Sequence, residues 1–268
     1  MKIAVSNIGF RPFEHEEELE ALYSMDVAAI EVAPSRVWPN TWDGLAPRDI
    51  ENYRSTVAGK GIDIVGLHSL LFDHPELGLF GGLERRTNLL RFFVHLSGIC
   101  RDLGGYTLIW GGGRMRGDVA LEEAKSVAID FFGELALQIE AHGTCFCLEP
   151  LAPEDTDFIN SVLEAQEIVH AVNQSSLKVQ IDAKALAANG ELRTEIFEAV
   201  GKDLVHYHAN EPGFEVLGSS GIVDHSAAGQ CLRTIGYNAY VSLEQKMIDA
   251  ENPMALIAES VAVMKEAY

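Results

Sequence analysis

The chain has 268 residues, of which 47% are hydrophobic, and a formal net charge of −20 at pH 7. This length can bury a large core and suits either one barrel domain or two small domains. The strong negative charge repels phosphodiester backbones and anionic lipid, so we expect neither nucleic acid nor a membrane as a partner.

The start of the chain and the cysteines bear on where the protein is found. No apolar stretch approaches the roughly 20 residues that a membrane-spanning helix needs. Asn7 and Gly9 interrupt the short apolar run of MKIAVSNIGF, so this segment is not expected to be a signal peptide. The four cysteines include no CxxC pair, which is typical of reduced, buried thiols. We therefore expect a cytoplasmic protein.

Strand-like and helix-like segments alternate along the chain. Short apolar runs predict strands at residues 2–10, 27–34, 62–70, 106–113, 145–151, 177–183, 204–210 and 239–245. Apolar residues at helical spacing predict helices at 15–24, 47–61, 83–104, 121–143, 161–173, 192–202, 225–236 and 253–268. Several of the helical segments end at a glycine, as helices commonly do. This alternation predicts an α/β fold, a (β/α)8 TIM barrel that spans residues 1–268 as a single domain.

A doubly wound open sheet is the alternative arrangement of the same elements. Such a sheet usually carries a glycine-rich nucleotide-binding turn after its first strand, and NIGFRPF is not one. No linker, low-complexity segment or break in composition divides the chain, which favours the barrel.

The expected strand ends carry the chemistry. In chain order these ends bear Glu31, His68, Trp110, Glu149, Asp182, His208 and Glu244. The last four are separated by 33, 26 and 36 residues, about the length of one strand–helix unit. In a barrel they would meet at one mouth, where three carboxylates need a divalent cation to offset their repulsion. Oxygen ligands with one imidazole suit Mn, Mg or Co, and Zn could also bind.

The C-terminal half resembles a known superfamily. The segments LEPLAPEDTDFINSVLEAQEIV, VQIDA, HYHANEPG and GYNAYVSLEQK are similar to those of the xylose isomerase-like barrels. That superfamily includes sugar isomerases and epimerases, hydroxypyruvate isomerases, inosose dehydratases and endonuclease IV. The resemblance implies that Glu149, Asp182, His208 and Glu244 bind the metal. In the ketose 3-epimerase branch it also makes Glu149 and Glu244 the acid and base.

General chemistry leads to the same expectation. A proton next to a carbonyl is hard to remove unless the developing enediolate is stabilised, and a divalent cation can do this as a Lewis acid. Carboxylates on opposite sides of the carbon would give epimerisation, whereas one carboxylate serving two adjacent carbons would give aldose–ketose isomerisation. We therefore expect a metal-dependent isomerase or epimerase of a small sugar or sugar derivative.

Three positions depart from the epimerase pattern. Ala185 replaces a substrate-contacting His, Asp155 replaces a Glu, and Phe214 replaces an Arg. These changes disfavour 3-epimerisation of a free ketohexose. For substrate binding we nominate six residues, some of which are open to a structural role instead: His68, Trp110, Arg114, Arg116, Asp155 and Glu211. Arg114 and Arg116 would grip a carboxylate or phosphate.

Other functions remain open at this point. An inosose-type dehydratase would use the same metal site to expel a hydroxyl group, and a non-catalytic binding barrel would use no chemistry. A repair endonuclease would need further histidines and a basic surface, which the charge of −20 disfavours. A homodimer or homotetramer is also left open.

Overall fold

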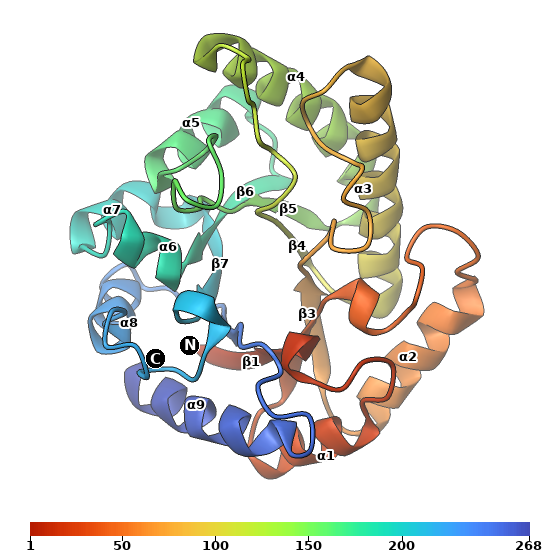
Figure 1. Ribbon diagram of the computed structural model, residues 1–268, viewed down its shortest axis with the longest axis vertical. Helices are drawn as coiled ribbons and strands as arrows, with labels where there is room; N and C mark the ends of the chain where they lie inside the picture. The colour runs from red at the N-terminus through yellow and green to blue at the C-terminus, as the bar shows by residue number, and fades with distance from the viewer.

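The computed structural model describes residues 1–268 and contains a closed barrel of eight parallel strands in chain order. Figure 1 looks down this barrel, with the helices arranged around it. The strands are β1 Lys2–Ser6, β2 Ala29–Val32, β3 Asp63–Leu67, β4 Thr107–Trp110, β5 Cys145–Leu148, β6 Leu177–Asp182, β7 Leu204–Ala209 and β8 Tyr240–Leu243. β1 pairs with β8 and closes the ring. The predicted (β/α)8 architecture is confirmed.

Nine α-helices accompany the strands, one more than expected. They are α1 Glu16–Ser24, α2 Pro47–Gly59, α3 Leu83–Leu103, α4 Leu121–Ile139, α5 Val162–Val172, α6 Ala183–Ala188, α7 Thr194–Val200, α8 His225–Thr234 and α9 Pro253–Ala267. The additional helix is α6, which follows β6 directly. Asp182 forms its N-cap, because the carboxylate accepts a hydrogen bond from the amide of Ala185 at 2.8 Å.

The apolar faces of the helices pack against the outside of the barrel. In α4, the buried side chains Ala128, Phe132, Leu135 and Ile139 recur at helical spacing, as the sequence predicts. Phe132 packs against Trp110 of β4 with 5.1 Å between ring centroids. Most of the core therefore lies between the sheet and the helices, and it fixes the directions in which the strand ends point.

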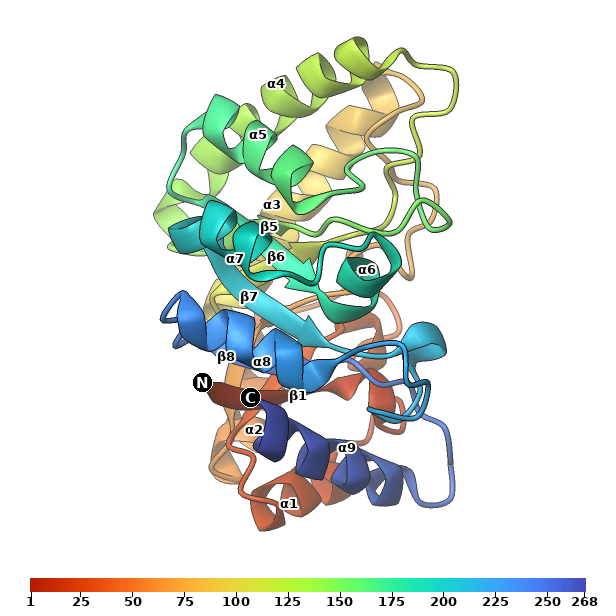
Figure 2. The same cartoon turned by 90° about the vertical axis from the view of Figure 1, so that its left-hand side faces the viewer.

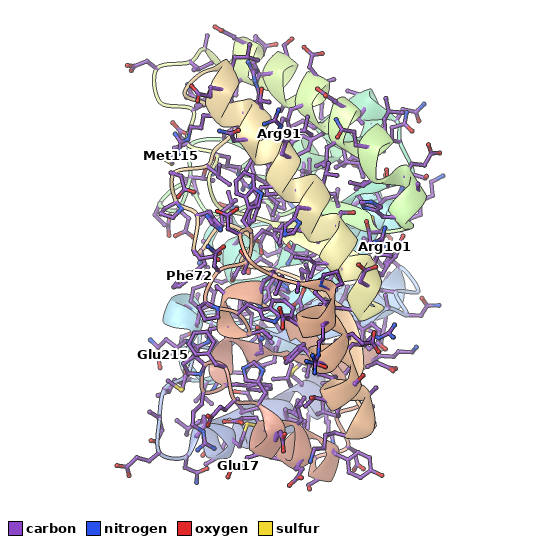
Figure 3. The ribbon with its side chains drawn as sticks, turned by 90° about the vertical axis from the view of Figure 1, so that its right-hand side faces the viewer. Glu17, Phe72, Arg91, Arg101, Met115 and Glu215 are labelled. Carbon is purple, nitrogen blue, oxygen red and sulfur yellow. The ribbon has the colours of Figure 1, made fainter.

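The two ends of the barrel differ. Figure 2 shows α6 and the longer loops on the side at which the strand arrows end, with the N-terminus at the opposite side. In Figure 3, Phe72, Met115 and Glu215 project from this loop side, while Arg101, in the last turn of α3, lies at the other end. The loop side, at the carboxyl ends of the strands, is where TIM barrels carry out chemistry.

No helix is both long enough and apolar enough to span a membrane.

Candidate metal centre

The carboxyl ends of β5 to β8 bring four metal-binding side chains together. Glu149 follows β5, Asp182 ends β6, His208 lies near the end of β7 and Glu244 follows β8. One ligand atom of each lies within 4.8 Å of the others, and all four residues are buried. They line a cavity of about 470 Å³ on the loop side. The structure thus brings together the four residues that the strand spacing singles out.

Glu31, at the end of β2, fixes the orientation of the His208 ring. Its Oε2 lies 2.9 Å from His208 Nε2, and its Oε1 lies 3.0 Å from His206 Nε2. A carboxylate can only accept a hydrogen bond, so His208 donates through Nε2. With Nε2 held by Glu31, Nδ1 is the ring nitrogen of His208 that faces the other carboxylates; it has no hydrogen-bond partner and lies 3.4 Å from Glu149 Oε1. An unpartnered basic nitrogen beside carboxylates is a suitable metal ligand.

Asn210 connects two of the carboxylates, and the sequence analysis did not identify it. Its side-chain amide donates hydrogen bonds to Asp182 Oδ2 and, at 2.9 Å, to Glu244 Oε2. Its carbonyl oxygen accepts from the amide of Lys184 at 2.9 Å. Asn210 follows His208 at the two-residue spacing of side chains on one face of a strand, and this parity could have predicted its inward direction.

The three carboxylates carry more negative charge than this small space can hold unaided. Burial, together with the neighbouring Glu149 and Glu244, raises the pKa of Asp182 to about 7. Burial alone would lower the pKa of His208, but the carboxylates of Glu31 and Glu244 raise it well above its ordinary range. Both directions reflect an excess of negative charge, which a divalent cation would offset. The donor set of carboxylate oxygens and one imidazole therefore fits such an ion.

Two residues of the loop after β4 hold Glu149 in place. A Cβ atom at Gly111 would lie 2.0 Å from Glu149 Oε2, so only glycine leaves room for the carboxylate in this position. Arg114 donates to the backbone carbonyls of Glu149 at 2.6 Å, Phe158 at 2.7 Å and Ile159 at 3.1 Å. Arg114 is 1% exposed and thereby ties the loops after β4 and β5 together.

Of the nominated substrate-binding residues, His68 and Asp155 line the loop-side cavity. Trp110 borders the same cavity, but its ring packs against Phe132 of α4 on the outside of the barrel, so its nomination as a substrate contact is wrong. His68 Nδ1 lies 3.3 Å from Glu244 Oε1. Asp155 accepts a hydrogen bond from Lys184 at 3.0 Å, and the Lys184 ammonium lies 5.0 Å from the centroid of the Phe214 ring. Lys184 was not nominated, because the sequence does not reveal that a residue of α6 reaches the cavity.

The other three nominated residues lie outside this cavity because their polar groups are engaged elsewhere. Arg114 is occupied by backbone carbonyls, as described above, and Arg116 donates to the carbonyls of Asp157 and Val119. Glu211 is fully buried and accepts from the amide of Gly218 at 2.7 Å, and it lies 3.1 Å from His225 Nε2. In the structure these three side chains therefore hold loops in place and do not face the cavity.

The family of the chain follows from its sequence. The family described as "Xylose isomerase-like TIM barrel" matches residues 19–267, so the chain belongs to this family.

Two curated relatives match parts of the chain. A D-psicose 3-epimerase from Ruminiclostridium cellulolyticum is 29% identical over 117 residues, which are 44% of this chain and 40% of the relative. An inosose isomerase from Bacillus subtilis is 28% identical over 137 residues, which are 47% of this chain and 49% of the relative. Each match therefore spans less than half of the relative's length.

Solved structures match the chain over nearly its whole length. D-psicose 3-epimerase from Clostridium cellulolyticum H10 has a TM-score of 0.80 and 18% identity, covering 100% of this chain and 98% of that one. The 3-keto-D-glucoside 4-epimerase of E. coli has a TM-score of 0.83 and 19% identity, covering 99% of each chain. At these identities the likeness shows a shared fold.

Proposed function

We propose that this member of the xylose isomerase-like TIM barrel family is a divalent-metal-dependent isomerase or epimerase of a small polyhydroxy ketone. The observation that carries the proposal is the buried cluster of Glu149, Asp182, His208 and Glu244 in a cavity of about 470 Å³. The activities named for the partial sequence relatives, a 3-epimerase and an inosose isomerase, support the same reaction class.

In this proposal, Glu149 and Glu244 move the proton. A bound divalent cation, held by the four clustered residues, would act as a Lewis acid that makes the proton next to the substrate carbonyl easier to remove. One glutamate takes that proton, and for epimerisation the other returns one to the opposite side of the carbon. Asn210 and His68 keep Glu244 oriented, while Gly111 leaves space for Glu149. Glu31 holds the imidazole of His208.

The cavity favours a neutral substrate. Its one lysine, Lys184, is paired with Asp155, so the two together offer hydrogen bonds to hydroxyl groups and no net positive charge. The guanidinium groups of Arg114 and Arg116 donate hydrogen bonds to backbone carbonyls. An open-chain ketose or an inosose suits this lining better than a sugar phosphate does.

The test joins metal binding to proton exchange. Dialysed protein reconstituted with Mn²⁺ should hold about one ion per chain by elemental analysis, and Asp182→Ala/His208→Ala should abolish this. Incubated in heavy water with a panel of ketoses and inososes, the protein should place deuterium at the carbon that reacts. Glu149→Gln and Glu244→Gln should each reduce exchange by at least about a hundredfold.

Three outcomes would contradict the proposal. Unchanged metal content in the double variant would remove the metal assignment. Exchange that survives within about tenfold in both Gln variants would leave the glutamates as ligands only. Loss of water from an inosose without net isomerisation would identify a dehydratase acting at the same site.

A further inference from the structure

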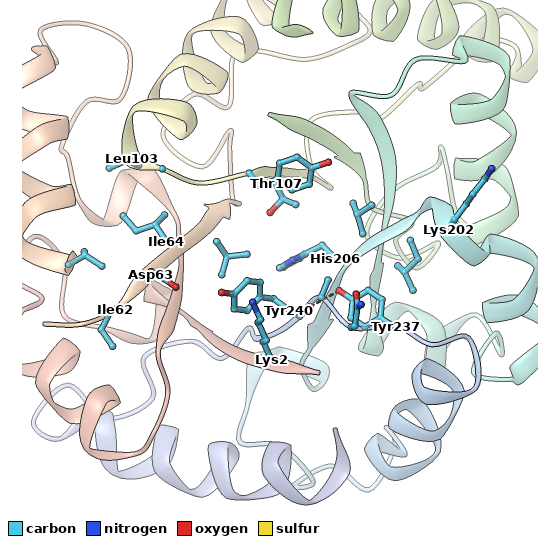
Figure 4. A pocket seen from close by; sticks show the side chains of 18 of the residues that line it. Lys2, Ile62, Asp63, Ile64, Leu103, Thr107, Lys202, His206, Tyr237 and Tyr240 are labelled. Atoms are coloured by element: carbon cyan, nitrogen blue, oxygen red, sulfur yellow. Dashed lines mark hydrogen bonds between the residues drawn. The ribbon is translucent and has the colours of Figure 1, made fainter. Parts of the chain in front are cut away.

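A second and larger cavity lies at the opposite end of the barrel from the metal centre. Its volume is about 920 Å³, and we call it the N-terminal cavity because residues of β1, β3, β4, β7 and β8 near their starts line it. Figure 4 shows Thr107, His206 and Tyr240 pointing into its middle, with Lys2 beside them. No step of the proposed reaction uses this cavity.

Buried polar atoms inside the N-terminal cavity have no partner within the protein. His206 is fully buried and Thr107 is 2% exposed, yet neither His206 Nδ1 nor Thr107 Oγ1 makes a hydrogen bond. Such unpaired groups normally cost stability, and native proteins contain few of them. Both atoms belong to residues that line this cavity, which indicates a place for a ligand's polar groups.

The rim of the N-terminal cavity is positively charged, in contrast to the chain as a whole. Lys2, Arg54 and Lys202 line it with one acidic residue, Asp63, although the chain carries a net charge of −20. Arg54 is paired with Glu51 at 2.7 Å, whereas Lys2 and Lys202 make no ion pair. Figure 4 shows Lys2 beside the middle of the cavity and Lys202 at its edge, and these two unpaired positive charges attract an anion.

Aromatic side chains supply the apolar part of the lining. Tyr106, Tyr237 and Tyr240 contribute three rings, and 13 of the 23 lining residues are hydrophobic. The Lys2 ammonium lies 5.3 Å from the centroid of the Tyr240 ring, so charge and aromatic surface adjoin. Ligand sites commonly combine a mostly apolar lining with a few polar groups, in volumes of about 300 to 1,000 Å³.

We propose that the N-terminal cavity binds a small organic anion with a planar ring, such as an aryl carboxylate, sulfonate or phosphate. The acidic group lies against the Lys2 ammonium, with Lys202 adding positive charge at the edge of the cavity, and the ring packs among the tyrosines. A polar atom of the ligand reaches Thr107 Oγ1 or His206 Nδ1. His206 also contacts Glu31 at 3.0 Å, so this site adjoins the metal centre, but it uses none of the four proposed metal ligands and stands whether or not the protein catalyses a sugar isomerisation.

The probe for the test is 8-anilinonaphthalene-1-sulfonate, a fluorescent aromatic anion, titrated into the full chain. We expect one site per chain, with affinity at least about tenfold weaker in Lys2→Glu/Lys202→Glu, because both rim charges are reversed. The matched control is Lys125→Glu/Lys265→Glu, which makes the same change of charge outside the cavity and should bind like wild type. Thr107→Val, which keeps the side-chain shape, should also weaken binding.

A crystal structure of the complex gives the position of the probe. We expect the aromatic ring of the probe to lie among the three tyrosines. Equal affinities in the two lysine double variants would overturn the proposal, as would a probe bound elsewhere. A concentration-dependent dimer that excludes the probe would also overturn it, because a second copy would then cover the cavity. Removal of Mn²⁺, or loss of proton exchange in Glu149→Gln, should leave probe binding unchanged.

Discussion

Glu31 and His208 are 177 residues apart, yet their side chains meet inside the barrel with 2.9 Å between Oε2 and Nε2. This contact directs His208 Nδ1 toward the three carboxylates of the metal centre. Because Glu31 lies in the interior, its charge is costly to bury, and the imidazoles of His206 and His208 offset that cost and lower its pKa. We therefore propose that Glu31 is a positioning residue for the candidate metal centre.

The first prediction concerns this contact. Glu31→Gln should weaken Mn²⁺ binding by about 10- to 100-fold, because residues that orient a ligand imidazole typically contribute that much to affinity. Isothermal titration calorimetry measures it. The control is Glu18→Gln, another buried carboxylate, which pairs with Arg11 away from the site and should leave Mn²⁺ affinity unchanged. If both changes weaken Mn²⁺ binding equally, Glu31 contributes to the stability of the protein and not to the orientation of His208.

The second prediction compares two adjacent glycines. A Cβ atom at Gly111 would lie 2.0 Å from Glu149 Oε2, whereas one at Gly112 would meet nothing within 4 Å. Gly111→Ala should displace the flexible end of Glu149, which lowers Mn²⁺ affinity and proton exchange with little loss of stability. Gly112→Ala should change neither. Calorimetry and thermal unfolding of both variants check this, and indistinguishable Mn²⁺ affinities would contradict it.

The third prediction concerns Arg114. Arg114→Ala should lower the free energy of unfolding by about 3 kcal/mol, because it leaves several buried carbonyls without donors. Arg114→Lys should recover little of this, since an ammonium cannot reproduce the guanidinium fork. Arg116→Ala should stay folded and therefore tests substrate binding separately. The ratio of its affinities for phosphorylated and neutral ketoses should equal that of the wild type. A change in that ratio would restore the arginines to substrate binding.

The fourth prediction is a pH dependence away from the site. Burial alone would raise the pKa of Asp203, but hydrogen bonds from Lys178, His170 and Gln166 lower it to about 2. Since the folded-state pKa lies below the ordinary value of 3.8, this carboxylate stabilises the protein above pH 3.8 and the contribution is lost as pH falls toward 2.

Asp203→Asn should therefore cost about 1–3 kcal/mol at pH 7 and progressively less as the pH falls below 4. Urea unfolding of both proteins across this range measures the difference. Lys125→Met, which removes an exposed ion pair with Glu167, should cost less than about 1 kcal/mol. A cost of Asp203→Asn that does not vary with pH would contradict the prediction.

The sequence predicts the barrel well because one strand–helix period repeats through the whole chain, and buried faces such as that of α4 follow helical spacing. Strand spacing also predicts which side chains meet at the loop side. Strand spacing does not predict the contacts that long polar side chains in loops make. Arg114 turns inward to carbonyls contributed by a later loop, and this depends on the path of residues 158–159. In the same way, the place of Lys184 in the lining of the loop-side cavity depends on α6, a helix too short to give a periodic signal in the sequence.

Asp182 has two roles that no other amino acid could fill together. Oδ1 begins α6 by accepting the amide of Ala185, while Oδ2 faces Asn210 and the metal centre. An asparagine could still cap the helix but would bring no charge to a cation. A glutamate would bring the charge but reach too far to cap. We therefore expect this position to be the least tolerant of change in the chain, because a local backbone turn and a distant charge balance both depend on one small carboxylate.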